Sequence, residues 1–216
     1  MALDLYFLDQ TITNDNILFT LRFYLWEGYW LSIGYHQKDI PPHWIELAEK
    51  GLIHIIRRPS GGGAVLHSGG ITYAITFKKP SYKKFSYSIV NDWLIRSFEE
   101  LGISLKTGHI KRTLLKNNCF GSSYTSDLID KDGYKRIGSA QYWKKGSFLQ
   151  HGEIQICPPN DLWASIFNEK SPPFFKLQLN HSELINYLTD SFLANHSNLN
   201  LERIILNKKN INDYLN

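Results

Sequence analysis

Apolar and polar positions in the first third of the chain predict several β-strands. Residues 17–26 place alternate side chains on two faces with a period of two, which is typical of a strand. The Glu27-Gly28 turn leads to a second strand at residues 30–35, and the two together predict a hairpin. A short apolar run at residues 52–56 predicts a buried strand, and residues 71–77 predict another strand.

Three other segments have the spacing of amphipathic helices. Residues 43–50 predict a short helix that Gly51 closes. In residues 88–101 the apolar side chains recur along one face, and Gly102 ends the segment. A third helix is expected from Ser182 to about Ala194, again with its apolar residues on one face.

The segment between these helices predicts an antiparallel meander. Strands are expected at residues 120–129, 134–143 and 148–156. The turn-forming sequences Asp130–Gly133 and Lys144–Ser147 separate them. In the middle strand the side chains of odd-numbered residues share one face, so Gly138 and Ala140 fall on the other and leave room there.

Together these elements predict one α+β domain over residues 1–216, with a mixed, mostly antiparallel β-sheet packed by helices. Residues 166–216 are expected to form a helical C-terminal part without an accessory domain. We find no internal repeat and no clear linker, which agrees with a single domain.

Composition narrows the function classes. The chain has 216 residues, of which 43% are hydrophobic, so a substantial core is expected. A net charge of +4 is too small to indicate nucleic-acid binding, and no apolar run reaches the roughly 18 residues of a membrane span. Two cysteines and no visible secretory signal favour the cytoplasm. The histidines and cysteines have no metal-ligand spacing, so no metal is expected.

Candidate chemistry is concentrated between residues 57 and 67. This segment reads Arg-Arg-Pro-Ser-Gly-Gly-Gly-Ala-Val-Leu-His, and it joins one predicted strand to another. Three glycines let backbone N–H groups approach a ligand closely, and the arginines suit a phosphate or a carboxylate. A plain glycine-rich hairpin is the alternative. The segment is neither a P-loop nor a Rossmann fingerprint, because it lacks both spacings.

Three ordered motifs resemble the lipoate-protein ligase and octanoyltransferase superfamily. The first is residues 57–67 with the Thr72-Tyr73 that follows, the second is Lys135-Arg136-Ile137-Gly138-Ser139-Ala140-Gln141, and the third is residues 149–154. The resemblance covers about residues 1–165, and it implies the α+β fold of biotin and lipoate ligases. Three motifs in order are far more specific than any one of them.

The resemblance implies two catalytic residues. Lys135 matches a family lysine at the acyl carbonyl, where an ammonium stabilises the developing oxyanion. Cys119, in Asn118-Cys119-Phe120, resembles the cysteine that carries an acyl thioester in one branch, the cysteine-dependent octanoyltransferases. The alternatives are an exposed strand lysine and a buried, inert thiol. Whether Cys119 faces Lys135 is not visible in the sequence.

The resemblance also assigns substrate binding to matched positions. The arginines would hold an adenylate phosphate or a phosphopantetheine arm, the glycine tract would cover the acyl chain, and the histidines would make polar contacts or serve structure. The matched positions are Arg57, Arg58, Ser60, Gly61, Gly62, Gly63, Ala64, His67, Thr72, Gly138, Ser139, Ala140, Gln141, His151 and Gly152.

The resemblance favours an octanoyltransferase, with a ligase and a non-catalytic module as the alternatives. The segments that resemble the cysteine-dependent octanoyltransferases are Cys119-Phe120, Leu66-His67, Gly138-Ser139-Ala140-Gln141 and Gln150-His151-Gly152. An octanoyltransferase would move a medium-chain acyl group from octanoyl-acyl carrier protein to a lysine of a lipoyl domain, in a 2-oxoacid dehydrogenase or the glycine cleavage H protein, without a cofactor. A lipoate-protein ligase would use lipoate, ATP and Mg through lipoyl-adenylate. A non-catalytic carrier-binding module is the third possibility. Residues 60–63 resemble ligases, because transferases more often carry arginine at Gly63, and Ser68 replaces a common acidic residue.

Overall fold

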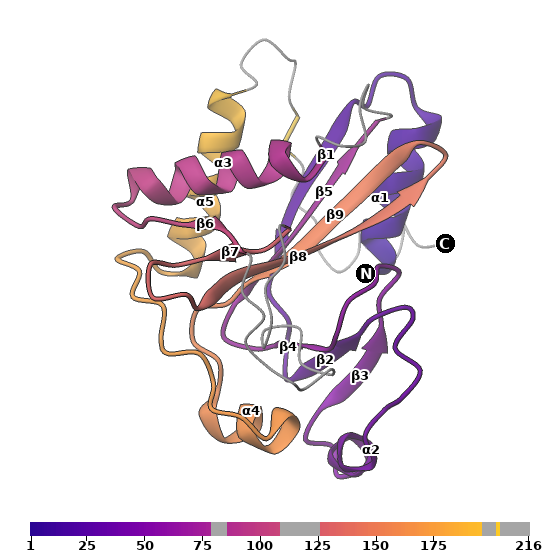
Figure 1. The fold of residues 1–216 in the computed structure, drawn as a ribbon. Coiled ribbons are helices and arrows are strands. Elements are labelled where there is room, and N and C mark those ends of the chain that lie inside the picture. The colour runs from indigo at the N-terminus through magenta and orange to yellow at the C-terminus, as the bar shows by residue number, and fades with distance from the viewer. Residues whose placement is uncertain (79–85, 109–125, 196–201, 204–216) are drawn as a thin grey trace.

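Two β-sheets organise the part of the chain that the structure describes. The computed structural model describes residues 1–78, 86–108, 126–195 and 202–203 (Figure 1). The main sheet has the order β1-β5-β9-β8-β7-β6 and is antiparallel throughout. The small sheet has the order β3-β2-β4, with β2 parallel to β3 and antiparallel to β4. The strands are β1 (Phe19–Tyr24), β2 (Trp30–Ile33), β3 (His54–Arg57), β4 (Val65–His67), β5 (Ile71–Phe77), β6 (Lys106–Thr107), β7 (Leu128–Ile129), β8 (Lys135–Lys144) and β9 (Ser147–Ile154).

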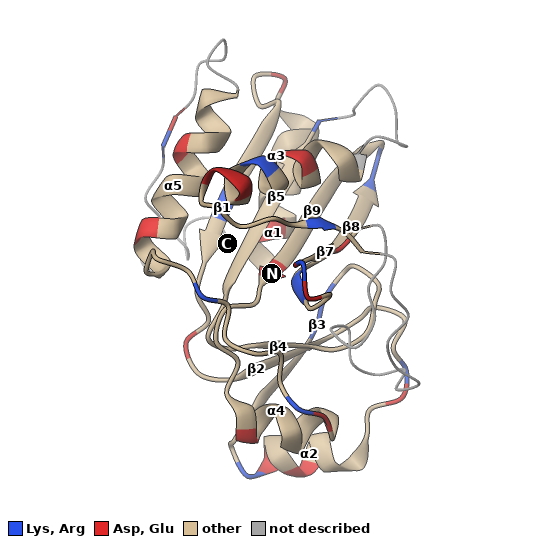
Figure 2. Ribbon diagram, turned by 60° about the vertical axis from the view of Figure 1, so that its left-hand side comes forward, with Lys and Arg blue, Asp and Glu red and all other residues tan. Residues whose placement is uncertain are grey.

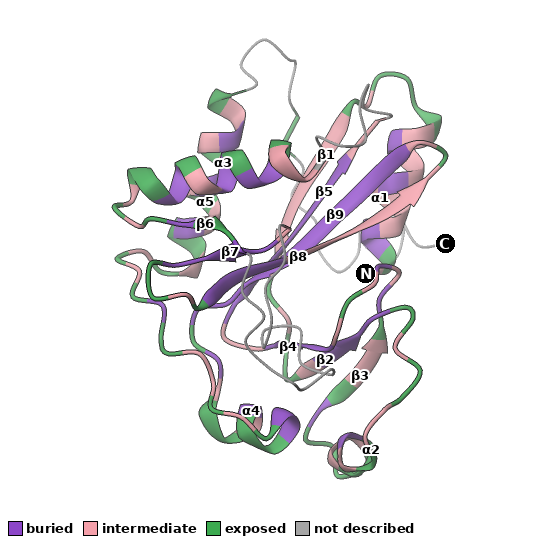
Figure 3. Cartoon of the chain, in the orientation of Figure 1, coloured by how far each residue is buried: buried purple, intermediate pink, exposed green. Residues whose placement is uncertain are grey.

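Helices cover both faces of the main sheet. Helices α3 (Ser86–Glu100) and α5 (His181–Ala194) pack on one face, where Ile71, Tyr73 and Ile75 contribute to their shared core. Helix α1 (Ala2–Thr13) packs on the other face, against Ala74 and Leu149. Strand β9 is therefore buried along its whole length (Figure 3).

The small sheet has a core of its own. Helices α2 (Pro42–Glu49) and α4 (Asn160–Phe167) pack against it through Trp44, Trp163 and Phe167. The indole Nε1 of Trp44 donates to the carbonyl oxygen of Ile166 at 2.7 Å, which ties the two helices together. Figure 2 shows acidic residues on both of these helices and on α3 and α5.

Most of the predicted elements are confirmed within a few residues. The α+β class, the mostly antiparallel sheet, the strand at residues 71–77 and the three predicted helices all agree with the structure. The meander is formed by β7, β8 and β9. Gly51 and Gly102 have φ values of +71° and +76°, a conformation that a side chain disfavours and that accounts for glycine at these helix ends.

The predicted hairpin is wrong. Strand β1 pairs with β5 in the main sheet, whereas β2 lies between β3 and β4 in the small one. Gly28 has a φ of +81°, so the chain does turn there, but the turn leads from one sheet to the other. Alternation within a strand indicates its two faces and carries no information about a distant partner.

Several other elements differ from the prediction or were missed. Helices α1 and α4 and strands β4 and β6 were not predicted from the sequence. The strand predicted for residues 120–129 begins later than expected, because residues 126–127 belong to no strand and β7 starts at Leu128. Residues 120–125 lie outside the described part of the chain. Among the residues described, no helix has both the length and the apolar character needed to cross a membrane. The single-domain organisation stays a prediction.

Candidate active site

The glycine loop, residues 58–64, joins β3 to β4 and packs against a turn at residues 34–37. Arg57 holds this turn, because its Nη1 donates to the carbonyl oxygens of Gly34 at 2.8 Å and Gln37 at 2.7 Å. A Cβ at Gly34 would lie 1.9 Å from the carbonyl oxygen of Gly62, so only glycine allows this approach. The turn therefore supports the loop from one side.

Arg58 supports the loop from within. Its guanidinium Nη2 donates to the carbonyl oxygens of Gly61 and Gly63, both at 2.7 Å. Its Nη1 donates to the carbonyl oxygen of Ser32 at 3.0 Å, and the residue is buried. The predicted phosphate-binding arginines thus each hold backbone carbonyls in the structure, and their binding role stays a prediction.

Four buried polar side chains connect the two sheets beside this loop. The Nε2 of His67 lies 2.8 Å from the hydroxyl of Ser32, and its Nδ1 lies 2.8 Å from the carboxylate Oε2 of Glu153. The hydroxyl of Thr72 donates to the same Oε2 at 2.5 Å. The ring of Trp26 stacks on His67 with centroids 4.6 Å apart.

His151 links β9 to the loop by a second contact. Its Nε2 lies 2.5 Å from the hydroxyl of Ser60. Burial lowers the pKa of His151 from 6.5 to about 4, with Asp4 opposing this change and Arg58 and His67 adding to it. The imidazole is therefore neutral at neutral pH, so the Ser60 hydroxyl and the ring each have one donor and one acceptor to offer.

We expect His151 to make the protein less stable in mild acid. Between pH 6.5 and about 4 the unfolded chain binds a proton at this imidazole and the folded chain does not. The free energy of unfolding then falls with decreasing pH, by up to about 1.4 kcal/mol per unit from this group. Urea unfolding of wild type and His151→Gln at pH 7, 6 and 5 measures the effect. Equal pH slopes for the two proteins would contradict it.

Lys135, at the start of β8, lies in a buried ion pair. Its Nζ is 2.9 Å from the Oδ2 of Asp127, and the two side chains are 2% and 3% exposed. The other carboxylate oxygen of Asp127 accepts the backbone N–H of Ser139 at 3.2 Å. An ammonium has three donors, so it can bind a carboxylate and also face a developing oxyanion.

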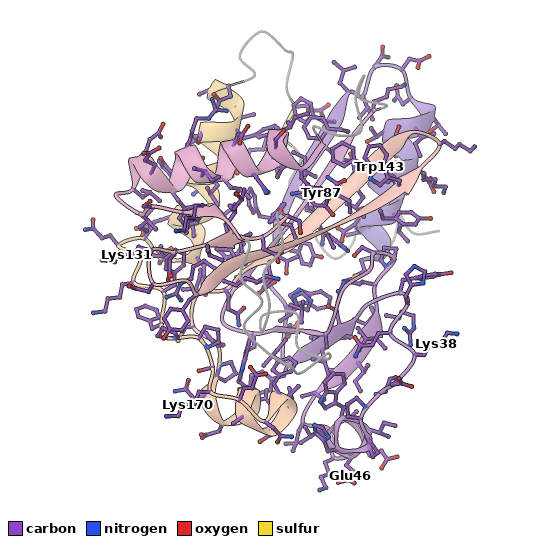
Figure 4. All side chains as sticks on the ribbon, viewed as in Figure 1. Lys38, Glu46, Tyr87, Lys131, Trp143 and Lys170 are labelled. Atoms are coloured by element: carbon purple, nitrogen blue, oxygen red, sulfur yellow. The ribbon has the colours of Figure 1, made fainter. Side chains whose placement is uncertain are left out.

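A polar cluster follows Lys135 on the same face of the main sheet. The hydroxyl of Tyr73 lies 2.7 Å from that of Ser139 and accepts from Gln150 at 3.0 Å. The amide of Gln141 donates to Gln150 at 2.8 Å. Tyr87, labelled in Figure 4 between α3 and the strands, hydrogen-bonds the backbone of Gln141.

Glycine at position 152 makes room for this cluster. A Cβ there would lie 2.6 Å from Cε1 of Tyr73 and 2.5 Å from the carbonyl oxygen of Gly138. Gly138 and Ala140 pair with Glu153 and His151, on the face opposite Ser139, as the alternation predicted. The second and third motifs thus lie side by side on β8 and β9, and Thr72-Tyr73 of the first motif lies beside them on β5. Residues 57–67 of the first motif reach β9 through the contacts of Ser60 with His151 and of His67 with Glu153.

Cys119 lies outside the described residues, so its position relative to Lys135 stays open. Sequence reasoning missed Asp127, Glu153 and Ser32. Glu153 lies two residues after His151 in a predicted strand, so the period of two already placed both on one face. Asp127 and Ser32 gave no signal, because their partners are set by the fold. Among the residues described, no cluster of three or more His, Cys, Asp or Glu side chains is arranged for a metal ion.

Comparison with known proteins identifies the family of this chain. The model of the lipoyl protein ligase A/B catalytic domain matches residues 1–173. The chain belongs to this family. Curated relatives named octanoyltransferase LipM are 33% identical over 165 residues in Halalkalibacterium halodurans and 34% identical over 162 residues in Brevibacillus brevis. The matches cover 70% and 69% of this chain, but only 59% and 58% of the relatives. The chain therefore spans about three fifths of their length.

Solved structures confirm the expected ligase-like fold. A lipoate-protein ligase A bound with ATP matches with a TM-score of 0.73 at 19% identity, over 99% of this chain and 85% of the other. A bi-partite lipoate protein ligase from Thermoplasma acidophilum, described with its E2 lipoyl domain, matches with a TM-score of 0.71 at 18% identity, over 99% and 84%. At these identities the likeness establishes the fold alone.

Proposed function

We propose that this chain transfers an octanoyl group from a carrier-protein thioester to a lysine of a lipoyl domain. The sequence similarity to octanoyltransferases is the observation that carries the proposal, because it rests on 29% to 35% identity in several curated relatives. The likeness to ligases is one of fold. Cys119 supplies the nucleophile that a transferase needs, and Lys135 is the buried cation in the second motif.

The proposed reaction has two acyl transfers. The thiolate of Cys119 attacks the carbonyl carbon of the octanoyl thioester, and the carrier thiol leaves with a proton. The amine of the acceptor lysine then attacks the acyl-Cys119 carbonyl, forms the amide and releases the cysteine thiol. Lys135 stabilises the negative oxygen in both steps. No cofactor enters this scheme, because the octanoyl group is already activated as a thioester, first on the carrier protein and then on Cys119.

The acceptor in this proposal is a lipoyl domain of a 2-oxoacid dehydrogenase or the glycine cleavage H protein, and the reaction is placed in the cytoplasm. The second candidate is a lipoate-protein ligase, favoured by the resemblance of residues 60–63 to ligases. That reaction would need lipoate, ATP and Mg, with the loop N–H groups and Arg57 or Arg58 at the adenylate phosphate. A carrier-binding module without catalysis is the third.

Intact-protein mass after incubation with octanoyl-acyl carrier protein tests the first candidate. We expect one octanoyl adduct that hydroxylamine removes and that peptide mapping places on Cys119, because a thioester is cleaved by this amine and an amide is not. A protein that forms no adduct but exchanges pyrophosphate into ATP in the presence of lipoate and Mg would be a ligase. A protein that does neither and still binds a lipoyl domain would be the module.

A further inference from the structure

A buried relay of hydrogen bonds runs from the main sheet to the glycine loop. We define the buried relay as Glu153, His67, Ser32 and Arg58. Its three links are 2.8 Å from Glu153 to His67, 2.8 Å from His67 to Ser32, and 3.3 Å from the Ser32 hydroxyl to the Arg58 guanidinium. All four residues are at most 4% exposed, so water does not compete for these hydrogen bonds.

The donors of the buried relay point in one direction in the tautomer of His67 that carries its proton on Nδ1, the nitrogen that faces the Glu153 carboxylate. Arg58 donates to the Ser32 hydroxyl, this hydroxyl donates to Nε2 of His67, and Nδ1–H donates to Oε2 of Glu153. The hydroxyl of Thr72 adds a second donor at the same oxygen. The relay thus begins at a fixed cation and ends at a carboxylate, an order in which every member polarises the next.

The order serine, histidine, glutamate is also that of a hydrolase triad, but the environment of Ser32 excludes a nucleophilic role. Its side chain is 0% exposed, and its oxygen already accepts from Arg58 and lies 2.8 Å from Nε2 of His67. A substrate carbonyl has no access to such an oxygen. The relay is therefore structural, and it positions the backbone that Arg58 contacts.

What the relay holds is the glycine loop. The other nitrogen of Arg58, Nη2, donates to the carbonyl oxygens of Gly61 and Gly63, 2.7 Å away in each case. Glu153 belongs to β9 of the main sheet, and His67 and Ser32 belong to β4 and β2 of the small sheet. One carboxylate in the main sheet is thus connected to two carbonyls of the loop by consecutive hydrogen bonds.

We propose that Glu153 is a positioning residue that, through His67, Ser32 and Arg58, sets the conformation in which the glycine loop binds the acyl donor. Its part in donor binding rests on the proposed function, in which residues 61–64 cover the acyl chain. The carboxylate acts through Oε2, since Oε1 is buried and has no hydrogen-bond partner among the described residues. Gly70 is part of the arrangement, because a Cβ there would lie 2.4 Å from Oε1.

Glu153→Gln tests the proposal, since it keeps the size and one accepting oxygen, removes the charge and replaces the second oxygen by an NH2 group. Loss of a hydrogen bond to a charged group changes an equilibrium by about 10-fold or more, so amide hydrogen exchange at residues 61–64 should increase by about the same factor. The KM for octanoyl-acyl carrier protein should rise about 10-fold, with kcat within about twofold of wild type. Ser32→Ala, which interrupts the relay in its middle, should give the same pattern.

Thr76→Val is the matched control, because it removes buried hydroxyl contacts with Thr11 and Thr20 on the same face of the main sheet, away from the loop. It should lower stability and leave both the loop exchange and the KM unchanged. Unchanged loop exchange in both relay variants would overturn the proposal, and so would an increase spread evenly over β5 and β9. Faster loop exchange with an unchanged KM would overturn the role in donor binding. An inactive wild type would refute the proposed function instead, and loop exchange would still decide whether the relay holds the loop.

Discussion

Cys119→Ala is expected to abolish octanoyl transfer to a lipoyl domain, with a loss of about 1,000-fold or more. The proposed reaction passes through an acyl thioester on this sulfur, and alanine has no atom to form it. The variant should still bind octanoyl-acyl carrier protein, because the glycine loop and Lys135 remain. Transfer of octanoyl to an isolated lipoyl domain, followed by mass spectrometry of the domain, measures the effect.

The second cysteine of the chain provides the control. Cys157 is exposed, follows β9 and lies outside all three motifs, so Cys157→Ala should transfer octanoyl at the wild-type rate. A Cys119→Ala protein that retains transfer at more than about a tenth of the wild-type rate would exclude the acyl-cysteine route. Loss of activity in both variants would indicate damage to the fold rather than removal of the nucleophile.

The local parts of this fold were predictable because each depends on residues close in sequence. The strand at residues 71–77 was predicted because five of its seven residues are hydrophobic, and the structure covers both of its faces. Gly51 and Gly102 mark helix ends through their positive φ. The strand pairing was not predictable in the same way. Residues 17–26 and 30–35 look like neighbours across a turn, yet they belong to different sheets, and only the complete set of strands decides between the two arrangements.

The residues of the candidate site also fall into two groups, those that were found from the sequence and those that were not. Arg57, Arg58, His67 and the glycines were found from one contiguous segment, and Lys135 from another. Their partners were not found, because Ser32, Asp127 and Glu153 are brought to them by sheet pairing across many residues. The structure also changes the interpretation of the arginines, since both hold backbone carbonyls of the loop or its supporting turn. The motifs identify candidate functional residues, and the fold shows which of these residues hold the loop or its supporting turn in place.

Variants of the buried Lys135–Asp127 ion pair should distinguish a catalytic role of Lys135 from a role in stability. Lys135→Met leaves the Asp127 carboxylate, 3% exposed, without the ammonium that lies 2.9 Å away, so we expect a loss of about 3–5 kcal/mol in the free energy of unfolding. In Lys135→Met/Asp127→Asn both charges are gone, and the asparagine oxygen can still accept the N–H of Ser139. Most of the lost stability should therefore return.

Octanoyl transfer should not return with it. If Lys135 stabilises the oxyanion, the double variant stays about 100-fold or more below wild type despite its restored fold. Urea unfolding and the transfer assay, applied to the wild type, both single variants and the double variant, complete the cycle. Activity that recovers together with stability in the double variant would show that the ammonium serves the fold alone. Activity that stays low in a protein of wild-type stability would identify Lys135 as the group that acts on the acyl carbonyl.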